Sequence, residues 1–200
     1  MRYLGIDFET ANSSYESACA IGIAVYEEGQ LLWTEHFYIK PPKEFGKFCW
    51  YNMKIHHIKK RMVEKAETFD RVWEKIKGAF YGSLVICHNA DFDMHVLVKL
   101  LEYYHIVVPD MDYICTVRVS QKVWPEMENH KLKTVSDCLG IPLNHHNPQS
   151  DAIAAAEIFK NSLQKMRCRD GRSLAQCVGL SIGKVRNGGI INCKNVKKCV

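Results

Sequence analysis

The sequence predicts an α/β fold in which helices flank a mixed central β-sheet. Three strand-like segments come first, and helical patterns then alternate with short apolar runs, an order typical of such domains. Of the 200 residues, 47% are hydrophobic and 24% are charged, which is typical of a globular protein that buries a substantial core. We therefore expect three leading antiparallel strands, followed by parallel strands.

The leading strands are predicted at residues 3–6, 20–26 and 31–39. Gly29 lies between the last two, where a glycine favours a hairpin turn. Segment 48–65 is rich in aromatic and basic residues. We expect it to be irregular or to form short helices.

The second half of the chain alternates between helical and strand patterns. Apolar residues from Phe69 to Phe80 follow helical spacing, and Gly82 follows as a stop signal. A capping role is expected for Thr116, and a helix-ending role for Gly140. The other predicted elements are strands at 84–87 and 113–115 and helices at 94–101, 129–139 and 151–166.

Charge divides the chain into a body, residues 1–166, and a basic tail, residues 167–200. From residue 165 onward there are nine lysines and arginines against one acidic residue, Asp170. A basic tail suits a nucleic-acid partner, and a solvated extension is an equal alternative. Residues 173–180 have helical spacing, whereas the segments after them are short and predicted to be turn-like. The role of the tail stays open.

The cysteines are expected to be reduced. Their number, nine, is odd, and no CxxC pair occurs. Four lie in apolar runs, where free cysteine behaves as a small hydrophobe: Cys19, Cys87, Cys115 and Cys138. Four in the tail lack the close pairing of structural zinc sites: Cys168, Cys177, Cys193 and Cys199.

The chain shows neither a signal-peptide pattern nor an apolar stretch near the 18 or so residues of a membrane span. We therefore expect a cytoplasmic protein without a membrane partner.

Two carboxylates, Asp7 and Glu9, follow the first apolar run. Side chains at positions i and i+2 of a strand lie on the same side. Adjacent carboxylates repel one another unless a cation lies between them, and oxygen ligands suit Mg²⁺ or Mn²⁺. The pair therefore predicts part of a metal site.

Three more candidates lie at the ends of predicted elements. Asp93 follows a buried strand, Asp151 lies in the first turn of the Ala-rich helix, and His146 lies in the loop before it. Each has an ordinary structural explanation when taken alone, such as a helix N-terminal acid. Their joint occurrence with Asp7 and Glu9 favours a catalytic site.

The order Asp-x-Glu, His-Asn-Ala-x-Phe-Asp and His-x₄-Asp resembles the DEDDh family of 3′→5′ exonucleases. Within the family it is most similar to the proofreading epsilon-type subunit of bacterial DNA polymerase III and to stand-alone relatives. The resemblance covers about residues 1–166 and implies an RNase H-like fold.

The resemblance also implies roles for individual residues. It makes Asp7 the bridge between two divalent cations, Mg²⁺ or Mn²⁺, and makes Glu9 and Asp151 ligands of the ion that binds the attacking water. Asp93, rather than Asp91, is the fourth metal-binding acid. His146, rather than its neighbour His145, is the general base.

Substrate contacts are implied in the same way. Phe8, Thr10, Asn89 and Phe92 fall where relatives line the terminal-nucleotide pocket. His56 matches a substrate-facing histidine in the family's Ile-His-Gly-Ile segment. Here that segment reads Ile-His-His-Ile, so His57 replaces the glycine and leaves the local backbone path open.

Elementary chemistry supports the same reaction. Two cations roughly 3.5–4 Å apart lower the pKa of water and neutralise the leaving oxygen of a phosphodiester. Histidine, with a pKa near 6.5, takes up the proton of the water at neutral pH. The basic residues Lys54, Lys59, Lys60 and Arg61 are candidates for phosphate contacts, with a solvated face as the alternative.

These observations predict a metal-dependent 3′→5′ exonuclease that releases nucleoside 5′-monophosphates from single-stranded or frayed DNA. Such an enzyme would serve proofreading or repair, with a DNA polymerase or another replication protein as a partner. Two alternatives stay open: a DEDDh exoribonuclease that trims RNA or oligoribonucleotides, and a non-catalytic module that binds nucleic acid or a polymerase.

Overall fold

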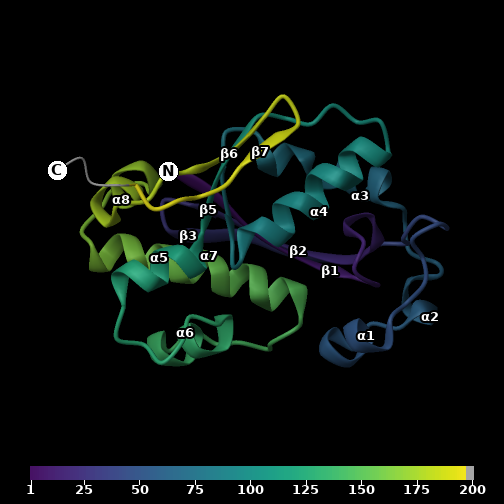
Figure 1. Ribbon diagram of the computed structural model, residues 1–200, viewed down its shortest axis with the longest axis horizontal. Coiled ribbons are helices and arrows are strands. Elements are labelled where there is room, and N and C mark those ends of the chain that lie inside the picture. The colour runs from purple at the N-terminus through teal and green to yellow at the C-terminus, as the bar shows by residue number, and fades with distance from the viewer. Residues whose placement is uncertain (197–200) are drawn as a thin grey trace.

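A computed structural model of the chain describes residues 1–196, and its centre is one seven-stranded sheet (Figure 1). The strand order is β3-β2-β1-β4-β5-β6-β7. Strands β1, β4 and β5 run parallel, and all the other neighbours pair antiparallel, so the predicted α/β class with a mixed sheet is confirmed. The strands are β1 (Arg2–Thr10), β2 (Ala18–Glu27), β3 (Gln30–Tyr38), β4 (Leu84–Cys87), β5 (Met111–Cys115), β6 (Gly183–Arg186) and β7 (Gly189–Ile191).

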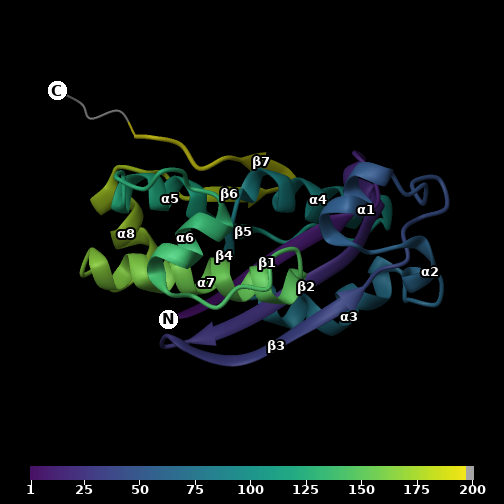
Figure 2. The ribbon, with the colours of Figure 1, turned by 90° about the horizontal axis from the view of Figure 1, so that it is seen from below.

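Helices cover both faces of the sheet. Those of one face, α3 and α4, enclose the larger core, and α5 to α8 enclose a second core on the opposite face. Figure 2 shows α5 to α8 grouped at one end of the view and α1 and α2 at the other. The helices are α1 (Trp50–His56), α2 (Lys60–Val63), α3 (Phe69–Phe80), α4 (Ala90–Tyr103), α5 (Thr116–Val123), α6 (Leu132–Leu139), α7 (Pro148–Lys165) and α8 (Gly171–Val178), with a 3₁₀ turn, η1 (Tyr15–Ser17).

Most predicted elements are present, and the differences have local causes. Helix α7 begins earlier than predicted because Pro148 occupies its first turn and the Asn147 side chain accepts a hydrogen bond from the Ser150 N–H. Helix α6 begins later, since Asn129 instead forms a turn with the Lys131 N–H. The capping role expected for Thr116 is wrong: its hydroxyl donates to the Cys87 carbonyl.

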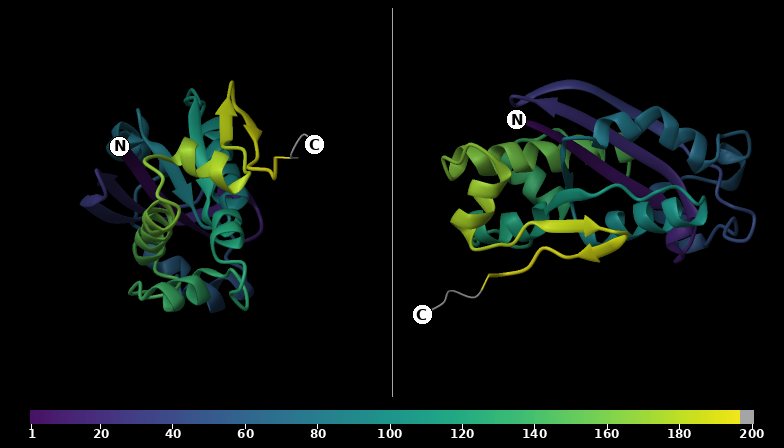
Figure 3. Two further views of the ribbon diagram at one scale, coloured as in Figure 1. Left: turned by 90° about the vertical axis from the view of Figure 1, so that its left-hand side faces the viewer. Right: turned by 90° about the horizontal axis from the view of Figure 1, so that it is seen from above.

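The segments after α8 are not the short turns that we expected. Strand β6 pairs with β5, with Val185 opposite Met111, and β7 completes a hairpin at the sheet edge. In Figure 3 this hairpin, in yellow, lies at the opposite edge from β3. A four-residue and a three-residue strand carry too little alternation to be recognised from sequence, and the pairing with β5 supplies their order.

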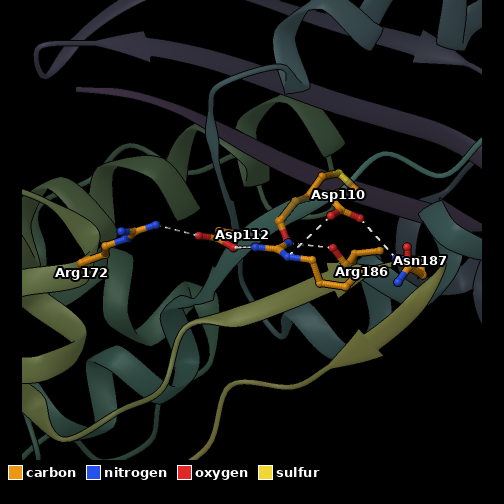
Figure 4. Close-up of polar contacts among 7 residues, drawn as sticks. Asp110, Asp112, Arg172, Arg186 and Asn187 are labelled. Atoms are coloured by element: carbon orange, nitrogen blue, oxygen red, sulfur yellow. Dashed lines mark hydrogen bonds and ion pairs between the residues drawn. The ribbon is translucent and has the colours of Figure 1, made fainter.

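Charged side chains fasten this hairpin to the sheet (Figure 4). The Arg186 guanidinium forms an ion pair with Asp112 on β5 and donates to the Met111 carbonyl at 2.7 Å. Arg172 on α8 approaches the same Asp112 carboxylate at 3.6 Å, and the Asn187 N–H donates to Asp110 at 3.2 Å. Two positive charges of the tail, Arg172 and Arg186, are therefore used within the fold.

Two glycines let α7 lie unusually close to β1 and β2. A Cβ atom at Gly5 would lie 2.2 Å from the Ala152 carbonyl oxygen, and one at Gly22 would lie 1.9 Å from the Pro148 carbonyl oxygen. Gly22 is also the pairing partner of Asp7. The first turn of α7 is thereby placed beside the carboxylates of β1.

Gly22→Ala is expected to lower the free energy of unfolding by about 1–3 kcal/mol, because α7 must move away from β2. Thermal unfolding measures the effect. Gly78→Ala is the matched control, since nothing lies within 4 Å of a Cβ atom there and alanine favours a helix by roughly 0.5–1 kcal/mol. Equal stability of both variants would contradict the close packing of α7.

Two further predictions concern the burial of the cysteines and the absence of a membrane-spanning segment. Cys19, Cys87 and Cys115 are buried as predicted, but Cys138 is exposed because it falls on the outer side of α6. Cys193 is buried too, and Cys199 lies outside the described residues. None of the helices described between residues 1 and 196 is long and apolar enough to cross a membrane.

Candidate active site

The first two predicted metal-binding carboxylates lie near the end of β1. Asp7 and Glu9 are half-buried, whereas Phe8 and Thr10 between and beyond them are buried. This alternation places Asp7 and Glu9 on one side of the strand. The predicted pair is therefore present, although β1 extends through Thr10 and the acids lie within the strand rather than past its end.

Two helix N-termini supply the other acids. Asp93, on the first turn of α4, accepts a hydrogen bond at 2.9 Å from the Phe8 N–H of β1. Asp151, on the first turn of α7, accepts one at 3.0 Å from the His146 N–H. Both side chains are almost fully buried, and both N-terminal turns favour negative charge.

These residues meet at one cleft with a volume of about 640 Å³. One carboxylate oxygen from each of Asp7, Glu9 and Asp151 lies within 4.8 Å of the others. The cleft brings together residues from β1, α4 and α7 with others that had no predicted role. Its lining includes Asp7, Glu9, Asp93, His146, Asp151, Phe8, Asn89 and Phe92 from the predicted set, and Ile55, His88, Val117, Gln121, His130, Lys131, Leu132 and His145.

The carboxylates fit divalent cations with oxygen ligands. One Asp151 oxygen, Oδ2, is occupied by hydrogen bonds, whereas the buried Oδ1 has no hydrogen-bond partner among the described residues. A buried carboxylate oxygen without a partner is costly unless a ligand satisfies it. The proximity of Asp151 to Asp7 and Glu9 makes a divalent cation with oxygen ligands the group that best satisfies all three.

The pKa values of the four carboxylates also indicate a site for a cation. Burial and the neighbouring acids raise the pKa of Asp7 well above its ordinary value and that of Glu9 to about 8. Burial raises the pKa of Asp93 to about 7 and that of Asp151 to about 6. Without a cation, the folded protein therefore retains protons on Asp7 and Glu9, and in part on Asp93, near neutral pH.

Without divalent metal, stability is expected to fall as pH rises from about 7.5 to 8.5. Unfolded carboxylates are already ionised there, while the folded cluster still releases protons, so the unfolded state binds fewer protons and rising pH favours it. Unperturbed histidines are largely neutral in this window. A loss of about 2 kcal/mol would lower the melting temperature by roughly 4–8 °C.

Thermal unfolding in EDTA, with and without added Mn²⁺, measures this effect. Mn²⁺ is expected to remove most of the loss at pH 8.5, and Glu9→Gln to flatten the pH dependence. A melting temperature that rises with pH in EDTA would show that repulsion among the four carboxylates does not destabilise the folded protein.

His145 and His146 lie side by side in the loop just before the N-terminus of α7. Their rings stack with centroids 3.8 Å apart and planes 18° apart. His146 has a left-handed backbone, φ 67°, which turns the loop there. Burial lowers the pKa of both histidines, which keeps their rings neutral at physiological pH.

The predicted substrate residues divide into two groups. Asn89 and Phe92 line the cleft as expected. Phe8 does so too, but its ring is only 2% exposed and belongs to the core, and its N–H holds Asp93. Thr10 and His56 are not part of the cleft lining.

A hydrogen bond joins His56 to the backbone of Thr10. Nε2 of His56 donates to the Thr10 carbonyl at 3.1 Å, while Nδ1 accepts from the Ile58 N–H at 3.0 Å. Both ring nitrogens are thereby used, and the side chain is only 5% exposed. In this structure His56 fastens α1 to the end of β1 instead of facing the cleft.

The structure also explains the replacement at His57. This residue ends α1 with φ 60° and ψ 4°, and its N–H donates to the Met53 carbonyl. A left-handed helix end is the conformation that glycine adopts most easily. The backbone therefore follows a glycine-like path with a histidine in place.

His57→Gly is expected to raise the free energy of unfolding by about 1 kcal/mol, because it relieves the left-handed strain. Chemical denaturation measures the change. Lys54→Gly, in the interior of α1, is the control and should destabilise by about 1 kcal/mol. A loss of stability in His57→Gly would mean that the histidine side chain makes a stabilising contact.

Other cleft residues were not marked by any local pattern. Lys131 and Gln121 belong to the segments around α5 and α6, which approach the cleft only after folding. His88 has a structural role: it hydrogen-bonds to Thr116 and to the His130 carbonyl, and burial lowers its pKa to about 4.

A mixed sheet with four clustered carboxylates and a nearby histidine defines the class of metal-dependent nucleases. The chain belongs to the exonuclease family, because the family model described as Exonuclease matches residues 4–159. The fold class is confirmed as RNase H-like by similar solved structures.

Two of the similar proteins are much longer bacterial proteins. The 3′-5′ exonuclease DinG of Bacillus subtilis is 31% identical over 172 residues, 83% of this chain and 18% of that protein. DNA polymerase III PolC-type of Thermotoga petrophila is 25% identical over 168 residues, 82% of this chain and 12% of that protein. The chain thus spans less than a fifth of either relative.

The match to similar solved structures covers most of their length. Exonuclease X in complex with 5′ overhanging duplex DNA has a TM-score of 0.68 at 19% identity, covering 89% of this chain and 99% of that one. The nuclease domain of 3′hExo, a DEDDh family member bound to rAMP, has a TM-score of 0.68 at 17% identity, covering 82% and 92%. At these identities the likeness shows the fold.

Proposed function

We propose that the chain is a divalent-metal-dependent 3′→5′ exonuclease that removes nucleoside 5′-monophosphates from the 3′ ends of single-stranded or frayed DNA. The observation that carries this proposal is the convergence of Asp7, Glu9, Asp93, Asp151 and His146 on one cleft. The acids come from three separate elements, so their meeting is a property of the fold rather than of local sequence.

The carboxylates would hold the metal. Asp7, Glu9 and Asp151 approach one another most closely, and Asp93 completes the set at the start of α4. When bound, a pair of Mg²⁺ or Mn²⁺ ions supplies an activated water and neutralises charge on the leaving oxygen. The N–H groups of Phe8 and His146 orient Asp93 and Asp151 before any substrate arrives.

The histidine and the cleft walls would handle the substrate. A ring nitrogen of His146 accepts the proton of the attacking water, a role suited to a neutral imidazole at physiological pH. Asn89 and Phe92 line the cleft beside Asp93, where the terminal nucleotide would lie. The left-handed backbone of Asn89, φ 73°, begins α4 next to this position.

The surface of α1 and α2 suits the incoming strand. Trp50 and Tyr51 are 68% and 65% exposed, although they are large aromatic residues. Lys54 lies 5.0 Å above the Trp50 ring, and exposed lysines and an arginine follow to Arg61. Exposed aromatic rings among positive charges are typical of surfaces on which single-stranded bases stack.

DNA is the proposed substrate because the similar bacterial proteins are a 3′-5′ exonuclease and a DNA polymerase. The second candidate is an exoribonuclease. It is favoured by the likeness to a structure described as 3′-end specific recognition of histone mRNA stem-loop by 3′-exonuclease, with a TM-score of 0.68 at 17% identity, covering 100% of this chain and 92% of that one. A non-catalytic module would not need the strained carboxylate cluster. A polymerase or another replication protein is the proposed partner.

Matched DNA and RNA oligonucleotides, digested side by side with Mg²⁺ or Mn²⁺, test the proposal. We expect DNA to be shortened faster than RNA and both reactions to stop in EDTA. Faster digestion of RNA would replace the proposed function with the second candidate. Tight binding without release of mononucleotides under either metal would establish the non-catalytic alternative.

A further inference from the structure

The two stacked histidines offer a second kind of metal site beside the acidic cluster. One ring nitrogen from His145, one from His146 and one carboxylate oxygen from Asp151 lie within 4.8 Å of one another. His145 Nδ1 is already 3.2 Å from Asp151 Oδ2. Three ligand atoms therefore converge on one side of the loop that precedes α7.

The ligand chemistry separates this group from the carboxylates of β1. Two imidazoles and one carboxylate favour borderline metal ions such as Zn²⁺ or Co²⁺, whereas a set of oxygens alone favours Mg²⁺ or Mn²⁺. Three protein ligands with a water in the fourth position are a common arrangement for Zn²⁺. The donor set, rather than the location alone, determines which ion binds.

The geometry needs an adjustment at the histidine rings. With Zn–N distances of about 2.0–2.1 Å, tetrahedral ligand atoms lie about 3.3 Å apart, so atoms at the 4.8 Å limit must approach one another by up to roughly 1.5 Å. His145 Nδ1 and Asp151 Oδ2, at 3.2 Å, already have about this separation. The His145 side chain is 34% exposed and can rotate, while Asp151 at 4% exposed is fixed on α7. Because a metal lies in the plane of each imidazole that binds it, the stacked rings must also tilt apart, and the exposed His145 ring is the one that can move.

We propose that His145, His146 and Asp151 form an inhibitory site for a transition-metal ion of the Zn²⁺ type. The ion would occupy the ring of His146, which could then no longer accept a proton. The inhibitory consequence rests on the proposed exonuclease function, whereas the binding of the ion does not.

Metal binding tests the site without nucleic acid. Zn²⁺ is titrated by competition with a chelating dye, and Co²⁺ by its visible absorption, both in millimolar Mg²⁺ and a thiol-free buffer. We expect His145→Ala to weaken binding by at least about tenfold. His105→Ala is the control, because His105 is exposed and follows the far end of α4, and it should bind as the unmodified protein does.

The exposed cysteines can also bind Zn²⁺, but His145→Ala leaves them unchanged, so only the difference between the two variants counts. Equal affinity in His145→Ala and His105→Ala would overturn the proposal, as would a Co²⁺ spectrum that His145→Ala does not alter.

Inhibition is measured separately, as the fraction of each variant's own Mg²⁺-dependent rate that remains in Zn²⁺. We expect His145→Ala to need at least about tenfold more Zn²⁺ for the same fractional inhibition. Equal inhibition of both variants would overturn the inhibitory role. If His145→Ala weakens Zn²⁺ binding but the unmodified protein digests no nucleic acid, the proposed metal site would stand and the exonuclease function would be disproved.

Discussion

Asp7→Asn is expected to reduce cleavage on the order of 10³-fold or more, because it removes the central carboxylate of the cluster at nearly constant volume. The same change is expected to stabilise the metal-free protein at pH 8. There Asp7 is forced to share a buried space with other acids, and burial raises its pKa well above its ordinary value. Lost activity with gained stability is a combination that damage to the fold cannot produce.

Steady-state cleavage and thermal unfolding in EDTA give the two measurements. Asp137→Asn is the matched control, since Asp137 is exposed on α6 and pairs with Lys133. It should retain activity and change stability by less than about 0.5 kcal/mol. An active Asp7→Asn protein would remove Asp7 from the reaction.

His146→Ala is expected to lower the rate of cleavage by about 10²–10⁴-fold while the affinity for divalent metal changes little, because the ring serves as a proton acceptor rather than as a ligand of Mg²⁺. The His146 backbone N–H, which holds Asp151, is retained in this variant. The position of the metal-binding acid is thereby preserved.

Single-turnover rates across pH, with added imidazole, distinguish chemistry from positioning. Partial recovery of the His146→Ala rate by imidazole is expected, and none is expected for Asp7→Asn. His105→Ala should behave as the unmodified protein does. A His146→Ala rate within twofold of normal would assign the proton transfer to another group, with His145 as the nearest ring.

Much of the site could be predicted because its chemistry is concentrated in short motifs. Asp7 and Glu9 share a side through the simple alternation of a strand, and Asp93 and Asp151 begin helices that are visible as apolar patterns. The order of these motifs then indicated the family before any distance was known.

The remainder depends on contacts between distant segments. The closeness of α7 to the sheet requires the missing side chains of Gly5 and Gly22, which no periodic pattern announces. The placement of His56 against Thr10 depends on how α1 packs on the end of β1. Strands β6 and β7 are ordered by β5 and by the ion pairs of Arg186, and these are properties of the folded chain alone.

The most direct measurement follows a 5′-labelled single-stranded DNA during digestion with Mn²⁺ by the unmodified protein, Asp7→Asn and Asp137→Asn. We expect a ladder that shortens stepwise from the 3′ end with the unmodified protein and Asp137→Asn, and intact DNA with Asp7→Asn. Internal cuts, or an equal ladder with Asp7→Asn, would contradict the assignment of this cleft as a 3′→5′ exonuclease site.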